Sequence, residues 1–398
     1  MGTEPHRILI AGAGVAGLSA ALCFAQRGAQ VAIFERALQL EEVGAGLQLS
    51  PNATRILSRL GVLDELMETA VEPDAVVLRR AEDLHEIARV PLGRAARARW
   101  GAPYLVSHRA DLQRALLNAV SKQDRISLHT GMSVEDIDLE GPSPALVTQS
   151  GRKEGRLVIG ADGVWSTVRS LSGKTGQSRF IGQVAWRRTF SADAQSVQAL
   201  VRFVSSRSVT AILHSSFHMI VYPVKSGTAF NVVAFTPTRR EMATGWSLKG
   251  DHSPLTKALE GTFSALSALV HDGGEWLAWP IHVADLDAPW SAPSGLALIG
   301  DAAHAMSPFA AQGAATAIED AATLASQLSG SDNLEMALQR WTIERRRRVL
   351  RVARRGAFNQ FVWHARGPAA IGRDLVLRLR SPESLMSDLD WLYGWDGA

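Results

Sequence analysis

Two residues able to move protons, His218 and Tyr222, lie four positions apart in the segment HMIVYP. The surrounding Val- and Phe-rich stretch is typical of β-strands, and positions four apart on a strand face the same side, so both rings can address one ligand. Histidine titrates near neutral pH, so His218 suits a general base and Tyr222 a positioning or relay role. The alternative is structural: His218 is a satisfied core histidine and Tyr222 a packing residue. His214 is off this pattern and is predicted to be structural.

A second pattern, GAGVAG, places Gly12, Gly14 and Gly17 between a β-branched strand and an alanine-rich helix. The first glycine makes a tight turn, the second lets the backbone approach a pyrophosphate, and the third lets helix and strand pack closely. The helix N-terminus presents free N–H groups to the phosphates. Glu35 ends the next strand, where its carboxylate can accept both hydroxyls of an adenosine ribose. These residues predict a bound dinucleotide without distinguishing NAD from FAD.

Residues some 270 positions later favour FAD. In GLALIGDAAHAMSPFAAQGAATAIEDA, Gly300–Asp301 come at a strand end, and a proline-containing loop leads to a helix start at Gln312–Gly313. Asp301 can hydrogen-bond a ribityl chain, and the helix N-terminus can stabilise negative charge at one end of a reduced flavin ring. An NAD site has no use for this second half-site. Another landmark, GADGVWSTVR, lies between these two in the sequence and puts Asp162–Gly163 at another strand end, with Arg169 after it.

These three motifs, intact and in the same order, resemble those of the single-component FAD-dependent aromatic hydroxylases, flavoprotein monooxygenases with the p-hydroxybenzoate hydroxylase fold. The resemblance covers nearly the whole chain. It implies that the first glycine motif binds the ADP part of FAD and that Gly300–Asp301 hold the ribityl chain. It also implies that Asp162–Gly163 lie close to both FAD and NAD(P)H.

Further segments, among them VGAGLQLSPNATRIL, HRADLQRAL and LDWLYGW, are similar to the branch that contains salicylate hydroxylase, 3-hydroxybenzoate 6-hydroxylase and 6-hydroxynicotinate 3-monooxygenase. In that branch a similar His and Tyr lie against the substrate hydroxyl. The resemblance implies that Arg109 contacts FAD, that Gln48 lies beside the flavin ring or substrate, and that Met132 makes a backbone contact on the adenine side.

The loop after Asp301 and one central segment add to the resemblance. Pro308 matches a proline beside the flavin C4a region, Phe309 is expected to wall the pocket, and His304 to orient the loop rather than exchange protons. The pair Trp186–Arg187 resembles a family WRG segment, with Arg188 in place of the glycine. The predicted catalytic residues are His218 and Tyr222, no metal site is predicted, and the predicted cofactor-binding residues are Gly12, Gly14, Ala16, Gly17, Glu35, Arg36, Gln48, Arg109, Met132, Asp162, Asp301, Pro308, Gly313 and Ala314.

The resemblance implies an NAD(P)H-dependent monooxygenase that hydroxylates a small phenolic or hydroxy-N-heteroaromatic ring, with tightly but non-covalently bound FAD. In this hypothesis hydride reduces FAD, O2 adds to give a C4a-hydroperoxide, and an electron-rich ring attacks the distal oxygen. A base that yields the phenolate activates the ring, and a closed apolar site keeps water from the intermediate. NADH or NADPH is expected to bind transiently over the flavin.

Other functions stay open. One is flavin-dependent oxidation of another small ring, such as a purine-like ring, or oxygen insertion into a tailoring substrate on the same fold. A second, from another class, is a non-catalytic flavin redox sensor. Nucleic-acid binding is a distant third, because it rests only on the arginine-rich segment ERRRRVLRVARRG at 344–356. A solvated helix face, or arginines paired with acids elsewhere, explains that segment better.

The elements that must position these residues predict an α/β fold, a Rossmann-like FAD-binding domain with an inserted antiparallel β-sheet substrate domain and a helical C-terminal segment. Residues 75–100 read as short strands with a basic tail. The expected FAD-binding domain comprises residues 1–75, 101–180 and 285–360, the β-rich substrate domain 76–100 and 181–284, and the C-terminal segment 361–398.

Composition is that of an ordinary globular protein, with 46% apolar and 20% charged residues and a formal net charge of +3 over 398 residues. The single cysteine, Cys23, excludes an internal disulfide and a cysteine-based metal cluster, and its place in the first helix predicts a buried packing residue. The chain shows no basic leader with an apolar core and no spanning apolar run. We therefore expect a cytoplasmic monomer or homodimer with no membrane or nucleic-acid partner.

Overall fold

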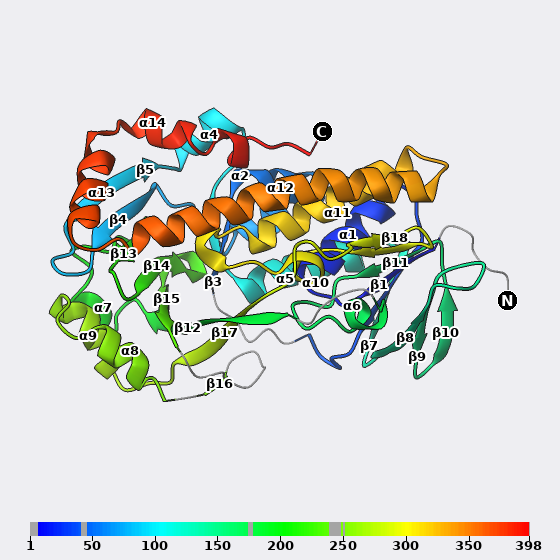
Figure 1. Ribbon diagram of the computed structural model, residues 1–398, viewed down its shortest axis with the longest axis horizontal. Helices are drawn as coiled ribbons and strands as arrows, with labels where there is room; N and C mark the ends of the chain where they lie inside the picture. Colours follow the sequence, from blue (N-terminus) through cyan, green and yellow to red (C-terminus); the bar gives the residue numbers. More distant parts are fainter. Residues whose placement is uncertain (1–6, 41–45, 174–177, 239–247, 250, 398) are drawn as a thin grey trace.

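The structure is a computed structural model that describes residues 7–40, 46–173, 178–238, 248–249 and 251–397. Figure 1 shows two sheets at opposite ends of the molecule, with one long helix, α12 (Leu334–Trp363), extending from one to the other. The first sheet holds the glycine motif and the second holds His218. The functional question is therefore how these two ends meet.

The first sheet has six strands and is parallel apart from its short edge strand. Its order is β18 (Ser291–Ala292), β19 (Leu296–Leu298), β11 (Leu157–Gly160), β1 (Ile8–Ala11), β2 (Val31–Glu35) and β7 (Ile126–Thr130). The central strands are uninterrupted apolar runs with no exposed residue, as expected for a parallel sheet covered on both faces. The main helices of this half are α1 (Val15–Ala25), α2 (Pro51–Arg59), α5 (Arg109–Ser121) and α11 (Gly313–Ser329).

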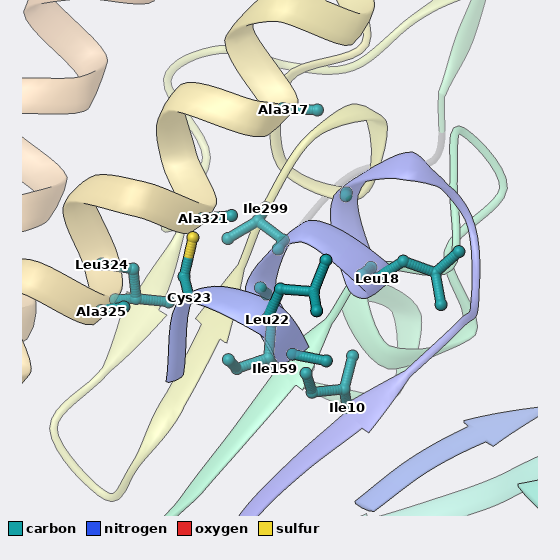
Figure 2. Packing of buried hydrophobic residues seen from close by; sticks show 14 of the residues in the cluster. Ile10, Leu18, Leu22, Cys23, Ile159, Ile299, Ala317, Ala321, Leu324 and Ala325 are labelled. Atoms are coloured by element: carbon teal, nitrogen blue, oxygen red, sulfur yellow. The ribbon is translucent and has the colours of Figure 1, made fainter. Parts of the chain in front are cut away.

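Helix α1 is buried along its entire length and packs against α11 and α5. Cys23 lies on this helix facing Ala321, Leu324 and Ala325 of α11 (Figure 2). Its thiol is free and buried, and burial raises its pKa to about 12. Cys23 is thus a packing residue, as the sequence predicted.

The second sheet has eight strands, and all neighbours are antiparallel except β13 and β4. Its order is β16 (Leu248–Lys249), β17 (Leu277–Val283), β12 (Arg179–Ser191), β15 (Ala229–Pro237), β14 (His218–Val224), β13 (Ser208–Leu213), β4 (Ala75–Arg80) and β5 (Glu86–Pro91). Side chains of one face form a core with the short helices α7 (Gln195–Gln198), α8 (Ser253–Ala258) and α9 (Ser264–His271). The opposite face is directed at the cavity described below.

Smaller elements complete the fold. They are the two-stranded antiparallel sheet β3 (Gly46–Leu49) and β6 (Leu105–His108), the three-stranded sheet β8 (Val134–Asp138), β9 (Ala145–Thr148) and β10 (Gly151–Glu154), and the short helices α3 (Leu63–Met67), α4 (Arg94–Trp100), α6 (Thr167–Leu171), α10 (Asp301–His304), η1 (Lys225–Gly227) and η2 (Pro308–Ala310). The basic residues 94–100, predicted as a tail, form helix α4 instead, because Ala96 and Trp100 bury one side of it.

The chain ends in three helices, α13 (Pro368–Leu379), α14 (Pro382–Ser387) and α15 (Asp390–Tyr393), and the first two contact β5. The predicted α/β class with a β-rich sheet and a helical C-terminal segment is therefore confirmed, while the exact domain boundaries stay a prediction. In the described part of the chain, no helix combines the length and the apolar character needed to cross a membrane.

Candidate active site

The first turn, between β1 and α1, shows why glycine is needed there. Gly12 has a φ of 100°, and a Cβ at this position would lie 2.6 Å from the carbonyl oxygen of Ala161. A Cβ on Gly17 would lie 2.0 Å from the carbonyl oxygen of Gly12, so α1 can approach its strand only with glycine here. A Cβ on Gly14 would meet no atom within 4 Å, and Gly14 lines the cavity. The three glycines thus have the three geometries expected of a phosphate-binding turn.

The acid at the end of β2 is held by the backbone on both sides. Glu35 accepts a hydrogen bond from the Ala13 N–H through Oε2 (2.8 Å) and from the Ala37 N–H through Oε1 (2.9 Å). Each oxygen keeps a second lone pair, and the residue lines the cavity. Met132 lies beside it, and its N–H donates to the Glu35 carbonyl (2.8 Å) and is already satisfied within the protein.

The second landmark follows β11. Asp162 accepts hydrogen bonds from the Ser166 hydroxyl and from the Val168 N–H, and burial raises the pKa of its carboxyl group. Arg169 donates to the carbonyl of Val164 (2.6 Å) and to that of Ala302 (2.7 Å). This arginine therefore ties the second landmark directly to the third.

The third landmark follows β19, and buried side chains of α11 and α12 hold it in place. Asp320 accepts from the Gly300 N–H (2.9 Å), pairs with Nε2 of His304 (2.6 Å) and pairs with Arg345 (2.8 Å). His304 is 1% exposed and faces this acid, in agreement with the loop-orienting role expected for it. These contacts fix the turn that presents Asp301 to the cavity.

The N-terminus of α11 is held by a second buried network. Gln312 donates to the Ser50 hydroxyl (2.9 Å), and Asn52 donates to Glu319 (2.6 Å), so α2 and α11 are joined through polar side chains. Glu319 also pairs with Arg345 and Arg348 of α12, at 2.8 and 2.7 Å. The late arginine cluster thus includes arginines paired with acids elsewhere, as predicted.

One cavity of about 800 Å³ joins these three turns to the inner face of the eight-stranded sheet. Every predicted site residue lines it except Gly17, which lies beneath the turn. Residues 43–45 of the VGAGLQL loop lie outside the described residues. Gln48, which follows them on β3, accepts a hydrogen bond from the Tyr104 hydroxyl (2.6 Å) at the cavity wall.

The sheet face of this cavity is formed by alternate residues of six strands, and most of them are apolar. They include Val76, Leu78, Val209, Ala211, Ile220, Val233, Phe235, Trp279 and Ile281. His218, Tyr222, Arg187 and His282 are the ionisable side chains that these strands contribute to it, and His282 lies beside Trp165 and Phe180, with ring centroids 5.8 and 5.6 Å apart. The strand period brings His218 and Tyr222 to one cavity, as predicted.

His218 is 1% exposed and surrounded by rings. It stacks on Phe235 with centroids 4.4 Å apart and an interplanar angle of 7°, and Phe309 and Trp363 lie at 5.0 and 5.2 Å. Burial, and secondarily the neighbouring His364, lower the pKa of His218 well below its ordinary value. The imidazole is therefore neutral at pH 7 and can accept a proton.

Tyr222 packs so closely against strand β3 that a Cβ on Gly46 would lie 2.6 Å from its ring. Burial raises the pKa of Tyr222, and the nearby Arg187 opposes that shift. Its phenol therefore stays protonated and can donate a hydrogen bond. His214, by contrast, lies outside the cavity lining, bonded to Ser216 (2.9 Å), which fits its predicted structural role.

Arg187 stacks over the Trp279 ring, with its Cζ 3.9 Å from the ring centroid. Burial lowers the pKa of the Arg187 guanidinium to about 10. Its Nε has no hydrogen-bond partner among the described residues. Strand β12 continues regularly through this point, and Arg188, where the family has glycine, turns to the other face over Phe190 (4.3 Å). The substitution therefore leaves the cavity unchanged.

The sequence did not predict several cavity residues. Tyr104 precedes the HRADL motif, and the alternation of β6 was a usable signal for it. Trp363 lines the cavity from the end of α12, some 140 residues after β14, and its neighbour His364 contacts His218. No local pattern in the sequence indicated that α12 and β14 would come into contact. Asn359 of the same helix donates to the Phe309 carbonyl (2.9 Å) and so ties α12 to the loop after Asp301.

The residues present fit an FAD. The N-termini of α1 and α11, each a source of free N–H groups, open onto the same cavity. A carboxylate stands at the end of β2, and Asp301 stands at the end of β19, where a ribose and a ribityl chain need partners. The cavity size is within the usual range for cofactor sites.

Comparisons with known proteins agree with this assignment. Residues 6–355 match a family described as FAD binding domain. The 3-hydroxybenzoate 6-hydroxylase 1 of Aquipseudomonas alcaligenes is 33% identical over 392 residues, which is 98% of each chain. A salicylate hydroxylase in a substrate complex has a TM-score of 0.81 at 23% identity, with 99% of this chain and 96% of that one covered. HpxO of Klebsiella pneumoniae, complexed with FAD and uric acid, has a TM-score of 0.79 at 21% identity, covering 96% and 95%.

Proposed function

This chain belongs to the FAD-binding-domain family of flavoproteins, and from that membership we propose that it is an NAD(P)H-dependent monooxygenase that hydroxylates a small phenolic or hydroxy-N-heteroaromatic ring. The observation that carries the proposal is the single cavity in which the three cofactor turns face His218 and Tyr222. A dinucleotide site alone would not need that second, ring-lined wall.

FAD, when bound, supplies the redox chemistry by taking a hydride from NAD(P)H and activating O2. The chain's own residues hold it. The turn at Gly12–Gly14 and the start of α1 would hold the phosphates, Glu35 the ribose, and Asp301 the ribityl chain. The N–H groups at Gly313 and Ala314 would face the end of the ring that becomes negative on reduction.

His218 acts as the general base. Its neutral imidazole takes the proton of the substrate hydroxyl, so the O–H bond breaks and the ring becomes an electron-rich phenolate. An ordinary phenol has a pKa of about 10, far above that of a buried imidazole, and each unit of mismatch costs about 1.4 kcal/mol. The transfer therefore needs neighbours that stabilise the anion. The Tyr222 hydroxyl, which stays protonated and can donate a hydrogen bond to the anion, is the group able to do this.

Arg187 indicates a second functional group on the substrate, in addition to the hydroxyl. Its guanidinium is positioned on Trp279 inside the cavity, with Nε left without a partner in the described part of the chain. A buried cation is costly unless an anion pairs with it. We assign to it a carboxylate on the substrate ring, which is the group that the hydroxybenzoate-named relative would offer. The remaining apolar wall excludes water from the reacting atoms.

A cytoplasmic location, as monomer or homodimer, is part of the proposal. The support for the location is the need for NAD(P)H, and the oligomeric state stays an expectation.

The test is a screen of hydroxybenzoates and hydroxypyridines for stimulation of NAD(P)H oxidation by the yellow, FAD-loaded protein. A matching substrate is expected to accelerate the oxidation many-fold and to form little peroxide. Uric acid and uncharged phenols are included as comparison compounds. If no ring in the screen accelerates the oxidation, the monooxygenase proposal fails and a redox-sensing flavoprotein is favoured.

A further inference from the structure

Two histidines that are 146 residues apart in the sequence meet at the edge of the cavity. His364 caps the C-terminal end of α12, and its Nε2 lies 3.3 Å from Nδ1 of His218. The ring centroids lie 5.2 Å apart and the interplanar angle is 70°, an edge-on arrangement suited to a hydrogen bond rather than to stacking. Neither the glycine motifs nor the substrate strand contains His364, so its presence here needs its own explanation.

The backbone decides which nitrogen of His364 carries a proton. Its Nδ1 lies 2.8 Å from the carbonyl oxygen of Gln360, and a carbonyl only accepts, so Nδ1 must donate. In the neutral ring the other nitrogen, Nε2, is then an acceptor. His218 must therefore donate to it from Nδ1, which leaves Nε2 of His218 without a proton.

That remaining nitrogen is the one available to a substrate. Within the part of the chain that the structure describes, Nε2 of His218 has no protein hydrogen-bond partner, and the residue lines the cavity. Phe235 and Phe309, which lie beside it, offer no hydrogen-bond donor. The basic lone pair of His218 is thus kept for the ligand by the contact made on the opposite side of its ring.

The end of α12 is itself held in place. Arg373 of α13 donates to the carbonyls of Val362 (3.2 Å) and Trp363 (3.4 Å) and pairs with Asp374 (2.8 Å). The His364 N–H donates to the Gln360 carbonyl as well (3.2 Å). These contacts make the orientation of the His364 ring a property of the folded helix end.

We propose that His364 is a positioning residue that selects the base form of His218. This inference rests on the proposed function of His218. His364 accepts the Nδ1–H of His218, so the substrate's hydroxyl proton goes to Nε2, and the resulting imidazolium keeps its Nδ1–H bonded to His364. Without an acceptor at position 364, a buried N–H would be unsatisfied, and the other tautomer, which directs a proton at the substrate, would gain population.

Few other titratable groups among the described residues face this pair. Tyr222 lies four residues further along β14, His214 in the turn before β14 is close enough to His364 to lower its pKa, and Glu82 lies 3.9 Å from His214. Burial lowers the pKa of both His364 and His218. Both rings are therefore neutral at pH 7, which the tautomer assignment requires.

The first test does not use catalysis. The FAD-loaded protein, labelled with ¹⁵N-histidine, is studied by NMR at pH 7, and the signals of His218 are identified by their loss in His218→Asn. We expect Nδ1 protonated and Nε2 unprotonated in the wild type, and the reverse tautomer to appear in His364→Leu. An Nε2–H tautomer in the wild type, or an unchanged tautomer in His364→Leu, would overturn the inference whether or not a substrate has been found.

The second test uses turnover with the ring identified in the screen. His364→Leu should lower kcat about 10- to 100-fold with FAD retained and KM little changed, since residues that orient a catalytic imidazole have effects of at least this order. His364→Gln, whose side-chain oxygen can accept the same hydrogen bond, should recover most of the loss. The matched control, His271→Leu on the exposed end of α9, should be unchanged. Equal activity of His364→Leu and wild type would contradict the proposal.

Discussion

The cavity has two walls, the cofactor turns and the inner face of the eight-stranded sheet, and the two differ in how their polar groups are bonded. On the cofactor side, backbone turns are fixed by buried polar groups that bond to one another, as in the contacts of Asp320 with Gly300, His304 and Arg345. On the substrate side, the sheet presents an apolar surface on which His218 and Arg187 keep unused hydrogen-bonding capacity among the described residues. The charged groups behind the cofactor wall pair with one another, although Nδ1 of His304 and Nη1 of Arg345 have no partner among the described residues, whereas the polar groups of the substrate wall are left for a ligand.

This difference predicts opposite responses to substitution. Breaking a polar contact behind the cofactor wall should cost stability, because a buried charge loses its partner. Removing a polar group from the substrate wall should cost activity and leave the fold intact. The predictions below test this contrast, from the largest expected effect to the smallest.

Arg345→Met should be the most damaging change. Arg345 is fully buried between Glu319 and Asp320, and its loss leaves two buried carboxylates short of a partner. We expect a loss of about 3–5 kcal/mol in the free energy of unfolding, measured by denaturant titration of the FAD-loaded protein. Arg347→Met on the exposed face of the same helix is the control and should change stability little. Equal effects of the two substitutions would refute the distinction between the walls.

His218→Asn should leave the fold and the FAD content intact and lower coupled hydroxylation by about 10²–10⁴. The measurement is product formed per NAD(P)H consumed, with Tm as the check on folding. A variant with full coupled activity would return His218 to the role of a core histidine.

The same residue sets a pH dependence. The pKa of His218 is lowered in the folded state, so the unfolded state binds its proton first as the pH falls. Above pH 6.5 the imidazole is neutral in both the folded and the unfolded state, and the free energy of unfolding has its full value. As the pH falls below 6.5, proton binding by the unfolded state progressively lowers the free energy of unfolding. His218→Asn should therefore lose less stability than wild type on acidification to pH 5, as measured by denaturant titration.

Gly12→Ala should weaken FAD binding by about 10- to 100-fold, because the new methyl group would both strain a positive φ and meet the Ala161 carbonyl. Fluorescence titration of the apoprotein measures this. Gly28→Ala has a similar φ of 87° and meets no atom within 4 Å, and Gly28 does not line the cavity, so it is the control for backbone strain away from the site and should bind FAD normally.

Arg187→Met should have the smallest effect, and a selective one. KM for a ring that bears a carboxylate should rise about tenfold, the value of one charge-assisted contact, while KM for the uncharged analogue should stay constant. Arg188→Met, one residue along the same strand but on the opposite face, is a close control and should leave both constants unchanged. Equal increases for both rings would disprove the carboxylate assignment.

The contrast between the walls also explains what the sequence could predict. The glycine turn, Glu35 and Asp301 follow from backbone geometry, which has a fixed spacing, so the sequence could predict that they lie at strand ends around one cavity, while their roles toward FAD stay a prediction. Strand alternation placed His218 and Tyr222 together, and the same rule applied to Arg187 and Arg188 would have directed one inward and the other outward.

The remaining features depend on which segments meet in space. His364 reaches His218 only because α12 spans both ends of the molecule, and residues 94–100 are helical because Trp100 is buried there. The arginine cluster was expected to pair with acids, but Glu319 and Asp320 could not be named as its partners. Contacts between segments that are distant in the sequence follow no local spacing, so the sequence alone does not predict them.

The most direct test of the account is the origin of the oxygen in the product. Turnover of the identified ring under ¹⁸O2 should give a hydroxylated product that contains one ¹⁸O atom, with one NAD(P)H consumed per product. A product without ¹⁸O, whether it has gained oxygen from water or lost hydrogen, would contradict the central claim that this cavity delivers oxygen to an aromatic substrate.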